Sequence, residues 1–310
     1  MTAAATTTAT PSAPPAGTRA APSQTTASSI ESEAYGPASV PHREAAPLWP
    51  ATAALAQREV VRFLRQRNRV IGAVATPLVF WLLLGLGLDR AAPIAVGDLT
   101  GDAVPQTIGY LTYFFPGVVV LMVLFTAIFT TISVIEDRRE GFLQSVLVSP
   151  APRLAIVLGR VLGGAVLATA QGVVMLLIGW ILIGGPGLAG FASAVLVVMA
   201  LSVLLTALGF CFAWPMDSTA GFHAVMNLLL MPMWFLCGAV FPIATAGWLK
   251  PLMALNPLAY GYDLLARSWD PRLASVGFGL PAWASAGILA GVTLILVLLS
   301  KGLVSRAARA

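Results

Sequence analysis

The feature that most constrains the fold of this chain is a series of six apolar runs, each long enough to cross a bilayer. An α-helix rises about 1.5 Å per residue, so about 20 apolar residues span the hydrocarbon core. The runs cover residues 70–88, 109–135, 154–183, 191–214, 221–243 and 281–300. Only 10% of the 310 residues are charged, far below what is usual for soluble domains. The sequence therefore predicts an all-α membrane protein with six transmembrane helices.

The cationic residues indicate how these six helices are oriented. An even number of spans places both termini on one side. If that side is the cytosol, the cytosolic ends carry Arg58, Arg62, Arg65, Arg67, Arg69, Arg138, Arg139, Arg153, Arg160, Lys301, Arg306 and Arg309. The outer side then carries only Arg90, Lys250, Arg267 and Arg272. This bias predicts an N-in, C-in, multi-pass protein of the plasma or inner membrane. The net charge of +5 then reflects contact with anionic membrane lipid, and no nucleic-acid partner is expected.

The chain divides into a tail and a membrane domain. Residues 1–48 are rich in Ala, Thr, Pro and Ser and contain no apolar run. Such a composition cannot bury enough surface to offset the entropy of ordering. We therefore expect residues 1–48 to be a disordered cytosolic tail, with no assignable role, and residues 49–310 to form the transmembrane domain.

The segment 52–69 precedes the first span and reads as an amphipathic helix. Its apolar positions recur at helical spacing, at Ala53, Ala56, Val60, Phe63 and Leu64. Its cations occupy the other faces, at Arg58, Arg62, Arg65 and Arg69. This pattern favours a helix lying in the membrane interface, with its apolar face down and its arginines reaching lipid headgroups. The alternative is an ordinary basic flank of the first span.

The loop between the second and third spans is the most charged part of the membrane domain. It opens with Glu136, Asp137, Arg138, Arg139 and Glu140, whose opposite signs are close enough to pair with one another. Gly141 permits a bend. Four apolar residues at helical spacing follow, namely Phe142, Leu143, Val146 and Leu147, and Ser149 and Pro150 end the helix. A short cytosolic helix with an exposed apolar face favours docking into a groove of a partner. Packing of that face back onto the bundle is the alternative.

Several motifs of energy conversion are missing from the sequence. A P-loop needs Gly-x-x-x-x-Gly-Lys-Ser/Thr, but the two lysines, Lys250 and Lys301, are followed by Pro and Gly. No metal-ligand cluster is present, and the spans lack the mid-membrane ionisable groups typical of ion-coupled transporters. Arg160 lies near the cytosolic end of its span and is expected to extend to the interface. Uphill transport would therefore need energy from a partner. An ion-coupled transporter and a non-transport scaffold or intramembrane enzyme stay open as alternatives.

Two stretches resemble a known family. The segment EDRREGFLQSVLVSPAPRLAIVLGRVL is similar to the loop after the second span in ABC-2 type transporter permeases. The segment NLLLMPMWFLCGAVFPIATAGWLKPLMALNPLAYGYDLLARS resembles the family's pattern around the fifth span. Its matching residues are Asn227, Pro232, Phe235, Leu236, Gly238, Phe241, Pro242, Trp248, Leu249, Asn256, Pro257, Leu258, Asp263 and Arg267. The resemblance covers about residues 50–305 and is greatest to daunorubicin-resistance type exporters. The chain departs from the pattern at Cys237, where Ser or Thr is common, and in its long tail.

The resemblance implies a working unit and roles for particular segments. Two such permeases, identical or paralogous, would work with separate ATPase subunits, which would hold ATP and Mg while this chain binds no cofactor. The coupling helix contacting the ATPase would involve Glu136, Arg139, Gly141, Phe142, Leu143, Val146, Leu147 and Pro150. The N-terminal interfacial helix, with Arg58, Arg62, Phe63 and Arg65, would lie near the ATPase. Residues 241–279 would form short re-entrant helices between spans five and six on the outer face.

The outer segment and the pathway also carry expectations. Asn256 and Pro257 read as a helix start, and Asp263 and Arg267 are spaced to pair on that helix. Together they form a predicted structural latch, with substrate contact as the alternative. The aromatic residues opening the second span, which include Phe114 and Phe115, favour an interfacial belt over a lining for substrate. Candidate pathway residues are Phe114, Phe115, Asn227 and Phe235. The apolar character of spans two and five favours an amphipathic, lipid-like or drug-like cargo, and a glycan stays open.

Overall fold

The computed structural model describes residues 47–96, 106–142 and 152–307. Six of its helices are long and apolar enough to cross a membrane. They are Arg67–Leu88 (α3, a π-helical turn and α4), Tyr110–Arg139 (α5), Arg153–Ile183 (α7), Leu188–Ala213 (α8), Thr219–Ala239 (α9 and a π-helical turn) and α12, which runs Ala282–Ala307. The structure is mostly helical, and its six candidate spans agree with the predicted six-helix membrane protein. The orientation of the termini and the depth of the outer helices stay predictions.

Several span boundaries differ from the sequence-based ranges, and two of the differences lie at segments that matter for the site. Helix α5 continues to Arg139, so most of the acidic and basic cluster belongs to its last turn and not to a loop. Helix α9 ends at Trp234 and is followed by a π-helical turn, Phe235–Ala239. Arginine and glutamate are good helix formers, so the polar residues after Ile135 extend the helix although they end the apolar run.

Shorter elements complete the described chain. Helix α2 (Leu48–Arg65) precedes the first span. Between spans five and six lie a 3₁₀ turn, Gly247–Leu249, then α10 (Lys250–Ala254), α11 (Pro257–Trp269) and a second 3₁₀ helix, Pro271–Val276. Strands β1 (Ile94–Val96) and β2 (Gln106–Ile108) pair antiparallel, with Ile94 opposite Ile108. This hairpin was not expected, and the β-branched residues of the two short strands favour it.

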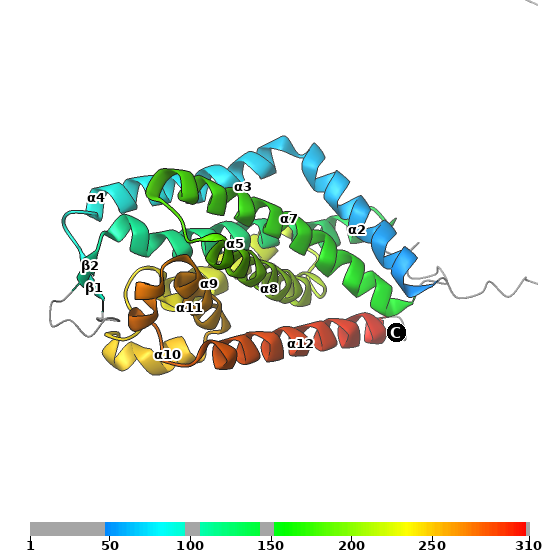
Figure 1. Cartoon of the computed structure of the whole chain (residues 1–310). Helices are drawn as coiled ribbons and strands as arrows, with labels where there is room; N and C mark the ends of the chain where they lie inside the picture. Colours follow the sequence, from blue (N-terminus) through cyan, green and yellow to red (C-terminus); the bar gives the residue numbers. More distant parts are fainter. Residues whose placement is uncertain (1–46, 97–105, 143–151, 308–310) are drawn as a thin grey trace, which may run out of the picture. The chain divides into compact units, whose positions relative to one another are not determined.

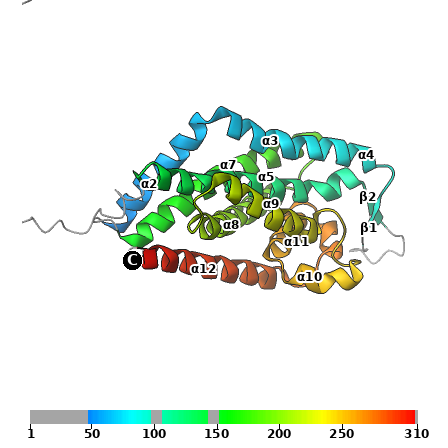
Figure 2. The ribbon, with the colours of Figure 1, turned by 180° about the vertical axis from the view of Figure 1, so that it is seen from behind.

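The two ends of the bundle differ in chemistry. Helix α5 finishes, α7 begins and α12 finishes at the end where α2 lies, which we call the arginine-rich end (Figure 1). The β hairpin, α10 and α11 lie at the opposite end, which we call the hairpin end (Figure 2). An ion-pair network at the first end and a smaller latch at the second hold the helices together, as described below.

Helix α5 is the central helix of the bundle. Nearly all of its side chains from Tyr113 to Ile135 are buried, and it packs against α3, α7, α8, α9 and α11. Small residues allow this close packing, as is common where helices meet in membranes. A Cβ on Gly164 of α7, or on Gly209 of α8, would lie 2.8 Å from the hydroxyl oxygen of Thr130 or Thr131, respectively.

Two glycines on α7 bring α2 unusually close. Gly159 and Gly163 are four residues apart and face α2. A Cβ on Gly159 would lie 2.5 Å from the Cβ of Leu55, and one on Gly163 would lie 3.1 Å from the Cα of Ala56. This Gly-x-x-x-Gly spacing is a recognised device for close helix packing. It places Glu59 of α2 within reach of α7.

Gly238 is a required glycine at the end of the fifth span. Its φ is +102°, a backbone conformation that other residues rarely adopt, and its added Cβ would lie 2.9 Å from the ring of Tyr262. Replacing Gly238 with Ala is expected to lower the free energy of unfolding by about 1–3 kcal/mol. Gly287→Ala is the matched control, because a Cβ there meets nothing within 4 Å. Thermal unfolding of the two variants in detergent micelles tests this, and equal midpoints would contradict it.

Candidate functional site

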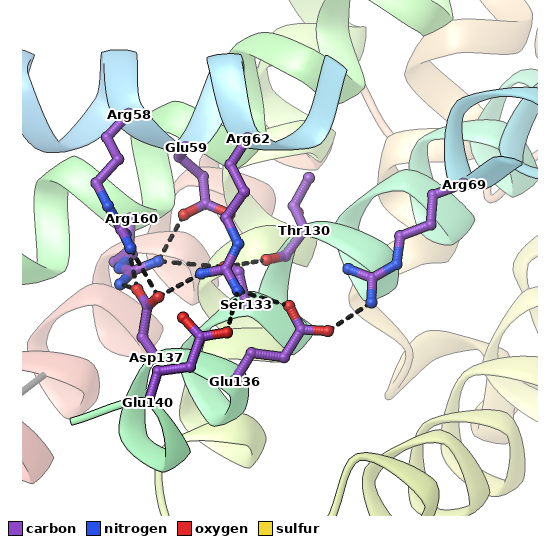
Figure 3. Close-up of polar contacts among 10 residues, drawn as sticks. All are labelled: Arg58, Glu59, Arg62, Arg69, Thr130, Ser133, Glu136, Asp137, Glu140 and Arg160. Carbon is purple, nitrogen blue, oxygen red and sulfur yellow. Dashed lines mark hydrogen bonds and ion pairs between the residues drawn. The ribbon is translucent and has the colours of Figure 1, made fainter. Parts of the chain in front are cut away.

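Asp137, in the last turn of α5, is the centre of the ion-pair network at the arginine-rich end (Figure 3). Its side chain is fully buried, with 0% exposure. Arg58 of α2 donates to both carboxylate oxygens, at 2.7 and 2.8 Å. Arg62 of α2 and Arg160 of α7 also donate to it. One buried carboxylate therefore joins three helices through three guanidinium groups.

Arg160 forms a second buried pair on the far side of Asp137. Its Nη1 donates to Glu59 Oε2 of α2 at 2.5 Å and to Ser133 Oγ of α5 at 3.2 Å. The side chains of Arg160 and Glu59 are only 5% and 3% exposed. The expectation that Arg160 extends to the membrane interface is therefore wrong. A buried guanidinium is stable where carboxylates and hydroxyls satisfy its N–H groups. Here α2 supplies one of these acceptors, the carboxylate of Glu59.

The remaining carboxylates of α5 lie around this buried core. Glu136 accepts from Arg62 at 3.0 Å and from Arg69 of α3 at 2.5 Å. Glu140, whose side chain is 62% exposed, accepts from Arg62 at 3.4 Å. The network thus contains four guanidinium groups, on Arg58, Arg62, Arg69 and Arg160, and four carboxylates, on Glu59, Glu136, Asp137 and Glu140. Within it the formal charges cancel.

The expectation that the charges of residues 136–140 pair with one another is wrong. Arg138 instead bonds to Asp217 at 3.0 Å, and Arg139 donates its Nε–H to the carbonyl oxygen of Asp217 at 2.8 Å. Adjacent residues of a helix point in different directions, so neighbours in sequence do not face each other. The acidic side chains face α2 and α3, whereas the two arginines face the turn between α8 and α9.

Phe142 connects the network to the predicted coupling helix. Gly141 has a φ of +76° and makes the bend that the sequence suggested. The guanidinium carbon of Arg58 lies 3.6 Å from the centroid of the Phe142 ring, a cation–π contact. Leu143, Val146, Leu147 and Pro150 lie outside the described residues, so their predicted contact with an ATPase stays a prediction.

Helix α2 has two faces with different neighbours. Thr52, Glu59 and Phe63 are buried against the bundle, whereas Val61 and Leu64 are 43% and 57% exposed. The prediction that Phe63 belongs to the lipid-facing stripe is therefore wrong, because the two glycines of α7 create a close helix interface on that side. The arginines of α2 also differ in their surroundings. Arg58 and Arg62 bind carboxylates of α5 instead of headgroups, while Arg65 is exposed.

At the hairpin end, the structure brings the four predicted latch residues to α11. Asn256 caps the helix by accepting from the backbone N–H of Leu258 at 3.1 Å, and it donates to the carbonyl oxygen of Met233 at 2.6 Å. Pro257 is the first residue of the helix. The guanidinium of Arg267 binds Asp263 at 2.5 and 3.2 Å. These contacts tie α11 to α9 and fix its start.

Asp263 also anchors α12. Its side chain is 1% exposed, and it accepts from Arg267 and from the hydroxyl of Ser285 at 3.1 Å. Asp263→Asn is expected to reduce the free energy of unfolding by about 2 kcal/mol, because charged hydrogen bonds are lost inside the protein. Asp270→Asn is the matched control, since the Arg272 side chain that pairs with Asp270 is 47% exposed. Urea unfolding in mixed micelles is the measurement, and similar losses in both variants would contradict the prediction.

The four candidate pathway residues do not meet on one surface. Phe114 and Phe115 are fully buried, and their rings contact Trp234 and Trp269 respectively. The expectation of an interfacial aromatic belt is therefore wrong here: these rings belong to the core because α5 is surrounded by other spans. Asn227 is exposed on α9, and Phe235 is 45% exposed.

A shallow apolar groove lies next to the exposed face of α9. It measures about 310 Å³ and is lined by Leu228, Leu229, Pro232, Met233, Leu236, Leu252, Leu255, Asn256 and Pro257. Within the described residues, no cluster of His, Cys, Asp and Glu could hold a metal ion.

Sequence reasoning missed the buried ion pairs that join α2, α5 and α7. Glu59 lies in a segment dominated by arginines, and the position of Arg160 near the end of its span favours extension to the interface. Two signals could have found them. An acidic residue inside a basic amphipathic helix needs a cationic partner when it is buried. The Gly-x-x-x-Gly spacing around Arg160 also marks a close helix interface.

Six helices that are long and apolar enough to cross a membrane, an ion-pair network at one end and a helical latch at the other describe a multi-pass membrane protein. The family model of the ABC-2 type transporter matches residues 50–268. The chain belongs to this family, as the resemblance predicted.

Individual relatives agree with this assignment. The chain is 28% identical over 211 residues to the transport permease ycf38 of Cyanophora paradoxa, covering 66% of this chain and 69% of that protein. It is 27% identical over 244 residues to the daunorubicin resistance ABC transporter permease protein DrrB1 of Streptomyces coeruleorubidus, covering 75% and 80%. It is 31% identical over 206 residues to nodulation protein J of Sinorhizobium fredii, covering 63% and 72%.

Proposed function

We propose that this permease exports an amphipathic, lipid-like or drug-like molecule, driven by ATP hydrolysis on a separate subunit that docks at the arginine-rich end. The bias of the cationic residues along the sequence supports a cytosolic location for that end, with both termini on the cytosolic side of the plasma or inner membrane. Two permease copies, identical or paralogous, complete the working unit. A glycan is the alternative cargo.

The observation that carries the proposal is the Asp137 network. Residues 143–151 follow α5 and precede α7, and Asp137 near the end of α5 is bonded to Arg160 in α7. Arg58 of α2 contacts both Asp137 and the Phe142 ring. Buried, fully paired groups connect elements rigidly. Any force on this segment would therefore move α2, α5 and α7 together.

The test is co-expression with a candidate ABC ATPase subunit and reconstitution of the two chains in proteoliposomes. We expect the two chains to purify together, and ATP-dependent uptake of an amphipathic dye into inside-out vesicles. Dissipation of proton and sodium gradients by ionophores should leave the transport unchanged. Transport that follows the ion gradient and ignores ATP would support the ion-coupled alternative and would contradict the proposal. Catalytic turnover by the chain alone would support an intramembrane enzyme and would also contradict the proposal.

A further inference from the structure

The junction between α2 and α3 contains a hollow that borders the Asp137 network at Arg69. It measures about 450 Å³ and is lined by five consecutive residues, Arg65, Gln66, Arg67, Asn68 and Arg69. Helix α2 ends at Arg65 and α3 begins at Arg67, so the chain turns at Gln66. The break gathers three arginines and two amides around one concave surface.

Two of these arginines have no partner among the described residues. Arg69 donates to Glu136 at 2.5 Å and so belongs to the network. Arg65 and Arg67 are exposed, and across the part of the chain that the structure describes neither makes a hydrogen bond, ion pair or ring contact. Each guanidinium keeps its full set of donors for an anion, and guanidinium groups match phosphate oxygens in geometry.

The charges at the start of α3 are the reverse of what a helix favours. The N-terminus of a helix carries partial positive charge and is stabilised by anions. The first turn of α3 contains no acidic residue and begins with Arg67 and Arg69. A bound anion would offset this repulsion, and no carboxylate of the described residues does so at Arg67.

The hollow lies where a span enters the bilayer. The apolar run begins at Val70, directly after Arg69, and Ile71 is 63% exposed. Leu64, on the other side of the hollow, is 57% exposed. The headgroup layer is about 5–7 Å thick on each side of the hydrocarbon core. At about 1.5 Å per residue, residues 65–69 fall within it, with apolar side chains beside them for acyl chains.

From these observations we propose that residues 65–69 form a binding site for one phosphate-bearing anionic lipid headgroup. The guanidinium groups of Arg65 and Arg67 bind the phosphate oxygens, and Gln66 and Asn68 bind the polar part of the headgroup. The acyl chains lie along Leu64 and Ile71. The lipid thereby fixes the angle between α2 and the first span, independently of the transported cargo.

The test is native mass spectrometry of the full chain in detergent, titrated with phosphatidylglycerol. We expect one saturable lipid per chain and much weaker binding of phosphatidylcholine, which has no net charge. The double variant Arg65→Gln/Arg67→Gln is expected to weaken phosphatidylglycerol binding by about 30-fold, since each arginine near an anionic surface contributes about fivefold. Arg65→Lys/Arg67→Lys keeps the charge but loses the planar fork of N–H donors, so it should retain only part of the binding.

The matched control is Lys301→Gln/Arg306→Gln. These two residues are exposed on α12 and have no partner among the described residues, so the control removes equal charge at the same end. It should leave the affinity unchanged. An equal loss of phosphatidylglycerol affinity in both double variants, or no loss in either, would indicate diffuse electrostatic attraction and would contradict the proposed site. Displacement of the lipid by millimolar inorganic phosphate would keep the phosphate site but assign it to a soluble phosphate compound.

Discussion

Replacing Asp137 with Asn is expected to lower the free energy of unfolding by about 3–5 kcal/mol, the usual cost of breaking a buried ion pair. The Asp137 carboxylate has 0% exposure and three guanidinium partners. Asn is almost the same size but carries no charge, so it leaves Arg160 with Glu59 as its single anionic partner. Urea unfolding in mixed micelles, followed by tryptophan fluorescence, gives the measurement.

Glu140→Gln is the control for this prediction. Glu140 belongs to the same network, but its side chain is 62% exposed and 3.4 Å from Arg62, so its loss should cost less than about 1 kcal/mol. A second variant separates charge from packing. Asp137→Asn combined with Arg160→Met and Glu59→Leu removes the stranded cation together with the buried carboxylate that pairs with it, and should recover part of the loss, because a buried pair replaced by apolar groups is often tolerated. Equal effects of Asp137→Asn and Glu140→Gln would contradict the assigned role.

Phe142→Asp is expected to reduce permease-stimulated ATPase activity by about 30-fold without preventing membrane insertion, if the loss equals one interface hot spot of about 2 kcal/mol. Phe142 is half-buried and lies at the start of the predicted coupling helix, against the guanidinium of Arg58. Its replacement puts a negative charge into the expected contact with the ATPase. The measurement is ATP hydrolysis by the reconstituted complex at matched permease content.

Trp248→Asp provides the comparison for this result. Trp248 is 84% exposed and lies at the hairpin end, far along the chain from the coupling segment. It controls for the general effect of an added carboxylate on a membrane protein. ATPase stimulation should stay near that of the unmodified permease. If Phe142→Asp is as active as Trp248→Asp, the coupling segment does not act through Phe142.

The sequence was sufficient for the spans because hydrophobic length is a local property. The apolar run 154–183 matches α7, Arg153–Ile183, almost residue for residue. The pairing of Asp263 with Arg267 could also be anticipated, since four residues along one helix bring side chains together. These are inferences about one segment at a time, and periodicity supports them.

The partners of Asp137 could not be derived in the same way. Arg58 and Arg62 lie 79 and 75 residues from it along the chain. Their meeting depends on how closely α2 approaches α7, which two glycines decide. The burial of Phe114 likewise depends on α5 being enclosed by the other spans. Contacts between distant segments depend on how the helices pack, and the spacing of residues along the sequence does not predict that packing.

The equal numbers of guanidinium and carboxylate groups around Asp137 have an electrical consequence. A charge that crosses the membrane potential requires about 2.3 kcal/mol for every 100 mV. The described network holds four groups of each sign. When α2, α5 and α7 shift together, the cluster carries no net charge through the field. The paired charges cancel in the electrical work of such a movement, so the buried network itself adds no dependence on the membrane potential.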